Sequence, residues 1–223
     1  MSFLQVTIEL LEGLLYTFLI FGTTLLASLP LGLIISFGSM AKQKIISTIV
    51  RGFVWIIRGT PLMLQLIFFD VFPSYLSNIF GFDWYLRTDP EHLMMACIAF
   101  SINYACYFSE IFRGGIQSIP KGQYEAAQVL GLTKTQAFFK IVFLQVVKRI
   151  IPPASNEIIT LVKDTALASV VISVDLFTVA KHINNIKAAI WPIFYAGLFY
   201  LIVNGILTVV LSKIEKKLDY FKV

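Results

Sequence analysis

Charged side chains are scarce in this chain, which carries Asp, Glu, Lys or Arg at only 14% of its 223 positions. Soluble domains usually have about a quarter charged residues. Hydrophobic residues make up 57% of the chain and fall into long runs, and a helix that crosses a bilayer needs about 20 mostly apolar residues. The sequence therefore argues against an ordinary soluble domain and predicts an integral membrane protein.

Cysteine and histidine are also rare. The two cysteines, Cys97 and Cys106, are nine positions apart in one apolar run, and at about 100° per residue they would lie on nearly opposite faces of a helix. A disulfide between them is therefore not expected. Because the chain has only two histidines, His92 and His182, we expect neither a metal site nor a catalytic base.

Several sequence signals are absent. No G-x-x-x-x-G-K-S/T motif occurs, so the chain is not expected to bind or hydrolyse a nucleotide, and its energy source must be a partner or an ion gradient. Residues 1–13 have neither a basic region nor a small-residue cleavage site, so we expect no signal peptide. We find no internal repeat, low-complexity segment or separate soluble domain.

The apolar runs predict an all-α protein with about five transmembrane helices, because lipid admits only helices or closed barrels and these runs are too continuous for strands. Residues 14–217 are expected to form one transmembrane domain. Residues 1–13 form either an interfacial helix or the start of the first span, and 218–223 form a tail. The five runs are 14–37, 52–76, 93–111, 141–179 and 190–211.

The net charge of +5 does not indicate a nucleic-acid partner. The basic residues lie mainly in short loops between apolar runs, which is typical of membrane topology signals. Lys and Arg are concentrated in three segments: the loop after the first run, the 113–140 loop and the C-terminus. The loop after the second run is acidic on balance. This pattern predicts an outside N-terminus and a cytoplasmic C-terminus, although Lys181 and Lys187 fall on the outer side.

The 113–140 loop is long for a connection between spans, and its sequence predicts structure. Residues 123–130 favour a helix, and Gly131 can end that helix in the left-handed conformation. Thr133 and Gln136 then form the pattern of a capping box at the start of a second helix. Such an element either docks on a partner protein or lies on the lipid surface.

Four motifs along the chain resemble motifs of one protein family. Residues 124–131, Tyr-Glu-Ala-Ala-Gln-Val-Leu-Gly, are similar to the EAA motif of ABC-importer permeases. Residues 58–61, 110–123 and 161–167 resemble the polar amino acid permeases, which include the histidine, glutamine, arginine and cystine systems. The resemblance extends from about Thr17 to Lys217.

The resemblance implies a type I ABC importer (MetI-like) permease fold in a bacterial inner membrane. It implies that the permease forms a homodimer or a heterodimer. It also implies an ATPase subunit, which binds ATP and Mg and receives the 113–140 loop in a groove. An extracytoplasmic binding protein would deliver the amino acid. Ala127 would lie in that groove and Gly131 would allow the break between helices. The residues implied in coupling are Tyr124, Glu125, Ala126, Ala127, Leu130 and Gly131.

One position departs from the family pattern. The family motif usually ends in Leu-Pro, and the matching residues here are Phe143 and Leu144. The missing proline predicts a less kinked second helix at this point. Pro152 and Pro153 are expected to supply a break further along.

Polar residues inside the apolar runs are candidates for contact with cargo, because charges in a span are costly and usually face a cavity or a partner. Glu157, Thr160 and Asp164 would share one helix face, where they could hold an ammonium group; the alternative is pairing within the protein, for instance with Lys163. Asn103 and Thr60 are weaker candidates, since Asn103 could equally hold two helices together.

Arg58 and Glu110 favour a structural salt bridge near the cytoplasmic boundary. Two other classes of protein have long apolar runs as well. A gradient-driven amino acid transporter needs no docking loop and often shows inverted repeats. An intramembrane enzyme needs a nucleophile with a base, or a metal cluster, and the spans contain neither pattern. The resemblance implies a polar amino acid as cargo, and the two acids on one helix face point slightly toward a cationic or zwitterionic one.

Overall fold

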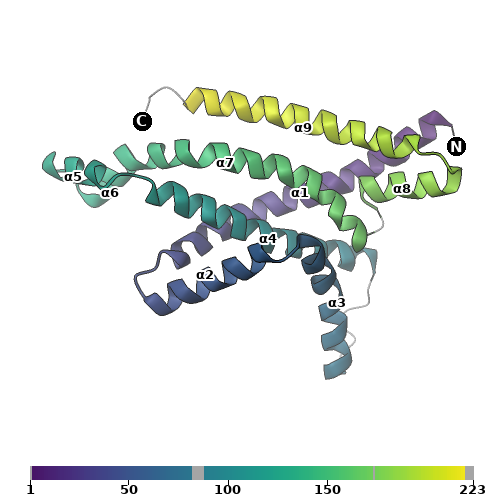
Figure 1. Ribbon diagram of the computed structural model, residues 1–223, viewed down its shortest axis with the longest axis horizontal. Helices are drawn as coiled ribbons and strands as arrows, with labels where there is room; N and C mark the ends of the chain where they lie inside the picture. The colour runs from purple at the N-terminus through teal and green to yellow at the C-terminus, as the bar shows by residue number, and fades with distance from the viewer. Residues whose placement is uncertain (1, 82–87, 173, 219–223) are drawn as a thin grey trace.

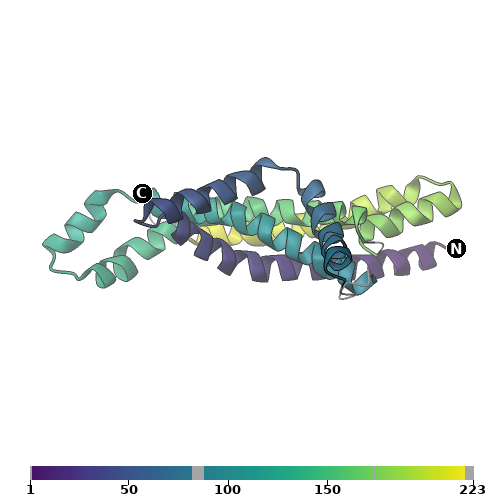
Figure 2. The same ribbon diagram turned by 90° about the horizontal axis from the view of Figure 1, so that it is seen from below.

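The computed structural model describes residues 2–81, 88–172 and 174–218, and these residues form helices and connections without a strand. Most of the helices run along the long axis of the molecule, while α3 projects from one side (Figures 1 and 2). The helices are α1 (Phe3–Ser39), α2 (Lys44–Gly59), α3 (Leu62–Phe80), α4 (Asp89–Gln117), α5 (Lys121–Val129), α6 (Lys134–Ala137), the π-helix η1 (Phe138–Val142), α7 (Phe143–Asp164), the 3-10 helix η2 (Thr165–Val170), α8 (Leu176–Lys187) and α9 (Trp191–Leu218).

The all-α membrane fold is confirmed. Four of the described helices, α1, α3, α4 and α9, are long and apolar enough to cross a membrane. The fourth predicted run corresponds to α7, η2 and the start of α8. α7 is 22 residues long but carries Lys148, Arg149, Glu157, Lys163 and Asp164. Its charges distinguish α7 from the other long helices and make it a candidate for a polar interface.

The N-terminal helix begins with a capping box. The Ser2 hydroxyl accepts from the Gln5 backbone N–H at 3.3 Å, and the Gln5 side chain accepts from the Ser2 N–H at 2.7 Å. From there α1 continues without interruption past residue 13 and through Pro30 to Ser39. The tail predicted for 218–223 lies outside the described residues except for Leu218, the last residue of α9.

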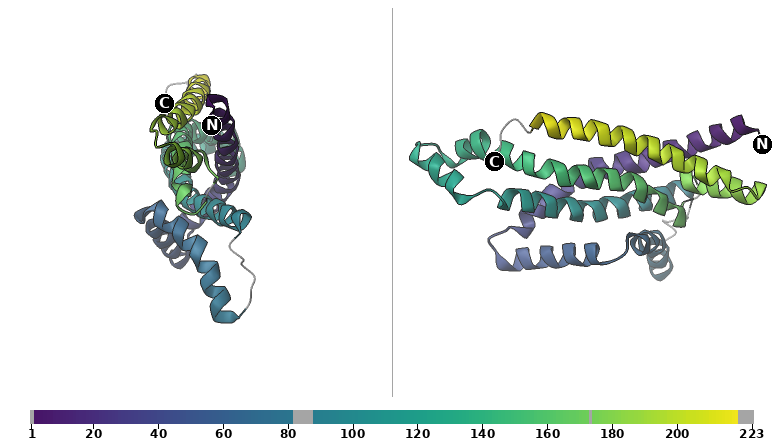
Figure 3. Two further views of the ribbon diagram at one scale, coloured as in Figure 1. Left: turned by 90° about the vertical axis from the view of Figure 1, so that its right-hand side faces the viewer. Right: turned by 45° about the horizontal axis from the view of Figure 1, so that its top comes forward.

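The second apolar run is divided between two helices. α2 ends at Gly59, and Thr60 and Pro61 adopt extended backbone conformations before α3 begins at Leu62. Proline has a fixed φ and disfavours helical conformation in the residue before it, which explains the break. α3 then leaves the direction of α2 at a steep angle (Figure 3).

The predicted break at Pro152 and Pro153 is wrong, because α7 continues through both prolines. The irregularity lies upstream instead. Residues 138–142 form a π-helical turn, in which the Phe143 N–H bonds the Phe138 carbonyl. The wider π-helical turn therefore lies directly before Leu144, the position at which the family motif has proline. A π-helical turn and a proline each disturb the regular hydrogen bonding of a helix.

α4 is the central helix. In its most apolar stretch 61% of positions are buried, against 6% in α9. A Cβ on Gly32 of α1 would lie 2.9 Å from the Ala105 carbonyl oxygen and from Phe108 of α4, so glycine allows α1 and α4 to approach closely. The exposed apolar face of α9 must be covered by lipid or by another subunit.

The two ends of the molecule differ in what they carry. The N-terminus and the α8–α9 connection lie at one end, while α5 and α6 lie at the other (Figure 1). The C-terminal end of α9 points toward the same end as α5 and α6 (Figure 3). The segments predicted to be cytoplasmic thus share one end of the fold.

Candidate coupling loop and cargo-facing surface

The 113–140 loop forms a compact projection at one end of the molecule (Figure 2). α4 continues as far as Gln117, and α5 follows with Pro120 as its N-cap. Gly131 has a φ of +72°, which confirms the left-handed turn predicted after α5. The predicted capping box is also present: Gln136 N–H donates to the Thr133 hydroxyl at 3.3 Å, and Gln136 Oε1 accepts from the Thr133 N–H at 3.0 Å.

The exposed surface of this loop is apolar at its tip. Val129 is 87% exposed and Leu130 is 74% exposed, although both are apolar. Glu125 and Ala126 are exposed as well, and Tyr124 is half-buried against the cluster of Ile119, Val142 and Val146. An apolar tip held on a short helix is a surface that gains free energy when a partner covers it.

The expectation for Ala127 needs correction. Its side chain is fully buried within this chain, so it is not available to a groove on another subunit. Ala127 instead packs inside the projection, and its carbonyl accepts from the Leu132 N–H at 3.0 Å across the turn. The spacing of the motif identified the segment but not which of its side chains face outward.

Polar contacts join the loop to α7. Gln145 of α7 donates to the Gln123 side chain at 3.1 Å, and Arg149 donates to the backbone carbonyl of Ser118. A side chain that bonds a carbonyl across two elements fixes their relative position. Sequence reasoning missed Gln145 and Arg149, because only the fold brings them beside the loop.

The acidic stripe predicted on α7 lies in the second half of that helix, and its three residues, Glu157, Thr160 and Asp164, are all half-buried. Asp164 accepts a hydrogen bond from the Tyr104 hydroxyl of α4 at 2.7 Å. The positive charge of Arg58 on α2 acts electrostatically on Glu157. Asp164 thus faces α4, and Lys163 is exposed.

Arg58 and Glu110 form the predicted salt bridge, with 3.9 Å between Nη1 and Oε2. Glu110 is held more closely by Arg113, which contacts both of its oxygens at 3.0 and 2.5 Å. The Arg58 guanidinium also lies 4.9 Å from the centre of the Tyr107 ring, a distance suited to a cation–π contact. Two helices, α2 and α4, therefore contribute to one charged region.

Thr60 and Asn103 are connected through Gln65, a residue that the sequence did not single out. The Gln65 amide nitrogen donates to the Thr60 hydroxyl at 2.7 Å and to the Ile57 carbonyl at 2.7 Å, while its oxygen accepts from Asn103 at 2.9 Å. Gln65 and Asn103 are buried. This arrangement attaches the break between α2 and α3 to the central helix, which supports the helix-holding alternative for Asn103.

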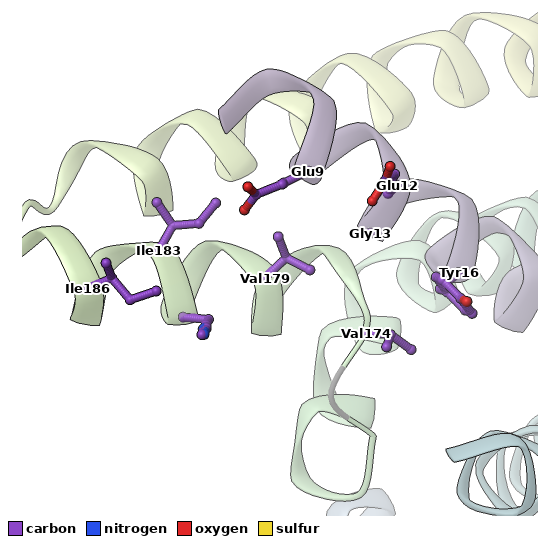
Figure 4. A pocket seen from close by; sticks show the side chains of 9 residues that line it. Glu9, Glu12, Gly13, Tyr16, Val174, Val179, Ile183 and Ile186 are labelled. Atoms are coloured by element: carbon purple, nitrogen blue, oxygen red, sulfur yellow. The ribbon is translucent and has the colours of Figure 1, made fainter. Parts of the chain in front are cut away.

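A pocket at the opposite end of the molecule contains none of the predicted site residues. Its volume is about 450 Å³, and it lies between α1 and the segment 174–186 (Figure 4). Glu9 and Glu12 project from α1 beside Tyr16, and Val179 and Ile183 face them from α8. Within the described residues no group of three or more His, Cys, Asp or Glu side chains is placed to hold a metal ion.

Comparison with protein families identifies the class. Residues 28–220 match the model of the binding-protein-dependent transport system inner membrane component. The chain therefore belongs to this family of inner-membrane permeases.

Two curated relatives are similar along nearly the whole chain. The L-cystine transport system permease protein TcyB of Bacillus subtilis is 34% identical over 94% of this chain and 86% of its own length. The arginine ABC transporter permease protein ArtM of Haemophilus influenzae is 32% identical over 96% of this chain and 93% of its own. The resemblance to permeases of polar amino acid ABC transporters is thus confirmed.

Solved structures share the fold. A crystal structure of an amino acid ABC transporter with histidines superimposes with a TM-score of 0.82 at 28% identity, covering 97% of this chain and 99% of that chain. An inward-facing structure of the MetNI methionine ABC transporter has a TM-score of 0.67 at 19% identity over 98% of this chain and 99% of that chain. The second likeness supports the fold alone.

Proposed function

We propose that this chain is the membrane-spanning subunit of an ABC importer that carries a polar amino acid into the cytoplasm. The similarity to a cystine and an arginine permease over more than nine tenths of the chain is the observation that carries this proposal. The proposal includes an outside N-terminus, a cytoplasmic C-terminus and a second permease copy. It also includes an ATPase subunit that binds ATP and Mg and a binding protein that delivers the amino acid.

The 113–140 loop would be the contact with the ATPase subunit. Val129 and Leu130 present apolar surface at its tip, and Tyr124, Glu125, Ala126 and Gly131 surround or shape that tip. Covering Val129 and Leu130 would contribute about 1.5–3 kcal/mol for each side chain. The buried Ala127 would act indirectly, by keeping α5 in place.

Movement of the loop would be transmitted to α7. The Gln123–Gln145 and Arg149–Ser118 contacts join the loop to the first half of this helix. Glu157, Thr160 and Asp164 lie in its second half, so a shift of α7 on ATP binding would change the surface that faces cargo. Ionised carboxylates on that surface would bind an ammonium group. Thr60 and Asn103 would hold the break between α2 and α3 against α4, because both hydrogen-bond to Gln65.

Uptake into proteoliposomes tests the proposed function. The chain is reconstituted with its ATPase subunit and binding protein, and uptake of L-arginine, L-histidine, L-glutamine and L-cystine is measured with ATP inside. We expect uptake of at least one of them that requires both ATP and the ATPase subunit. Uptake by the permease alone, driven by an ion gradient, would instead support a secondary transporter, which the exposed apolar tip of the loop disfavours.

A further inference from the structure

A basic cavity between α2 and α4 has no part in the proposed coupling or cargo contacts. It has a volume of about 250 Å³ and is lined by Arg51, Val54, Trp55, Arg58, Glu110 and Arg113. We call this cavity the arginine pocket. Three guanidinium groups and one carboxylate line it, so the lining carries two positive charges in excess.

The contacts of the three arginines leave this excess in place. Arg113 holds Glu110 through bonds of 3.0 and 2.5 Å, whereas Arg58 approaches Glu110 only to 3.9 Å. Arg51 donates through Nε to the uncharged backbone carbonyl of Ser39 at 2.9 Å. Excess positive charge beside apolar helices is costly, and an anion that enters the pocket would relieve that cost.

Two observations place the pocket at the edge of the apolar part of the bilayer. Arg51 bonds to Ser39, the last residue of α1, just after the first apolar run ends at residue 37. Arg113 follows the third apolar run, 93–111, and is close to the end of α4. Two spans therefore leave the hydrocarbon at the level of the pocket, which is the level of the lipid head groups and their phosphates.

The surface beside the pocket suits the rest of a lipid molecule. Trp55 lines the pocket and is 76% exposed, and tryptophan is enriched at membrane interfaces. Ile49, Phe53 and Ile56 lie within about 60° of one another on α2, and between 42% and 66% of each is exposed. Around the helix, Trp55 lies between this apolar face and Arg51. A lipid whose phosphate enters the pocket would therefore place an acyl chain along α2.

We infer that the arginine pocket binds the phosphate of an anionic phospholipid such as phosphatidylglycerol, with an acyl chain along the apolar face of α2. Guanidinium groups bind phosphate oxygens through paired N–H bonds, and basic pockets between membrane helices bind anionic head groups. A zwitterionic lipid is disfavoured, because its head group brings a further positive charge. The site does not depend on which amino acid is carried, and only its assignment to the cytoplasmic leaflet rests on the proposed topology.

Quenching of Trp55 fluorescence by brominated lipids tests this inference. The complete chain, with the subunits that co-purify with it, is placed in phosphatidylcholine nanodiscs that contain rising fractions of either brominated phosphatidylglycerol or brominated phosphatidylcholine. The emission of Trp55 is the part that is lost in Trp55→Phe. We expect half-maximal quenching at about a tenfold lower fraction of the brominated phosphatidylglycerol than of the brominated phosphatidylcholine.

Matched variants separate recognition by the pocket from general attraction of anionic lipid. Arg51→Gln should reduce the tenfold preference to about twofold or less, and Arg51→Lys, which keeps the charge without the paired geometry, should give an intermediate preference. Lys44→Gln removes the same charge from the same face of α2, outside the pocket, and should leave the preference unchanged. If Arg51→Gln fails to assemble, the comparison of the two lipids in the wild-type protein still decides the question.

Four results would overturn the inference. One is equal quenching by the two brominated lipids in the wild-type protein, and another is an unchanged preference in Arg51→Gln. The third is quenching by neither lipid, which would show that a second copy or another subunit covers this face. The fourth is displacement of the brominated phosphatidylglycerol by millimolar inorganic phosphate, which would assign the pocket to a soluble anion. Failure of the proposed function looks different, because ATP-dependent uptake would then be absent whatever the lipid.

Discussion

The 113–140 loop and the charged region between α2, α4 and α7 are built in opposite ways. The tip of the loop is shaped by contacts between near neighbours, namely the turn at Gly131 and the capping box at Thr133. The charged region joins residues far apart in the chain, such as Tyr104 with Asp164 and Arg58 with Glu110. A change at the tip of the loop should therefore affect docking alone, whereas a change in the charged region should affect how helices fit together.

The largest effect is expected at the loop tip. Val129→Asp combined with Leu130→Asp places two charges where exposed apolar side chains are proposed to be covered by the ATPase subunit. Loss of two apolar contacts amounts to about 3 kcal/mol or more, so ATP-dependent uptake should fall more than about a hundredfold. Uptake into proteoliposomes and co-purification of the ATPase subunit measure this.

The control for that pair is Gln128→Asp, since Gln128 is exposed on the same helix but polar. It should retain most of the uptake. Ala127→Trp offers a contrast, because its site is buried inside the projection and overpacking there should displace α5 itself. Full uptake by the double aspartate variant would show that the tip is not the docking surface.

The second effect concerns the contact between α4 and α7. A Cβ on Gly115 would lie 2.4 Å from Cγ1 of Ile150, whereas a Cβ on the neighbouring Gly114 would have no atom within 4 Å. Gly115→Ala should therefore destabilise the protein by about 1–3 kcal/mol through overpacking, and Gly114→Ala should have little effect. The thermal midpoint of the detergent-solubilised complex measures the difference, and equal midpoints would mean that α7 is free to move away from α4.

These two regions also show what the sequence could predict. Gly131, Thr133 and Gln136 act within a few residues of one another, and their roles were predicted correctly. The family resemblance and the helical composition likewise follow from order along the chain. Gln65 and Arg149 were missed because their partners lie in other elements. The spacing of the motif could not tell that Ala127 faces inward, because its burial depends on how the loop folds back on itself.

A third prediction concerns Gln65. Gln65→Leu removes the bonds to Thr60, Ile57 and Asn103, and leaves buried Asn103 without this acceptor. An unsatisfied buried polar group costs about 1–3 kcal/mol. We expect a lower thermal midpoint and slower uptake, because the break between α2 and α3 is no longer attached to α4. Asn103→Leu in the same chain should restore part of the stability, since both partners are then apolar, and an additive loss in the double variant would contradict this account.

The smallest effect is expected at Gly131, where the cost is conformational. A Cβ at this position would meet no atom within 4 Å, but φ is +72°, and a non-glycine residue in the left-handed region costs about 1–2 kcal/mol. Gly131→Ala should therefore loosen the turn between α5 and α6 and lower uptake several-fold, while the ATPase subunit still co-purifies. Gly122→Ala is the matched control, because Gly122 also has open space around it but is not at positive φ. Asparagine tolerates positive φ better than alanine does, so Gly131→Asn should recover part of the uptake. If it recovered none, backbone strain would not explain the loss, and contact of this glycine with the ATPase subunit would.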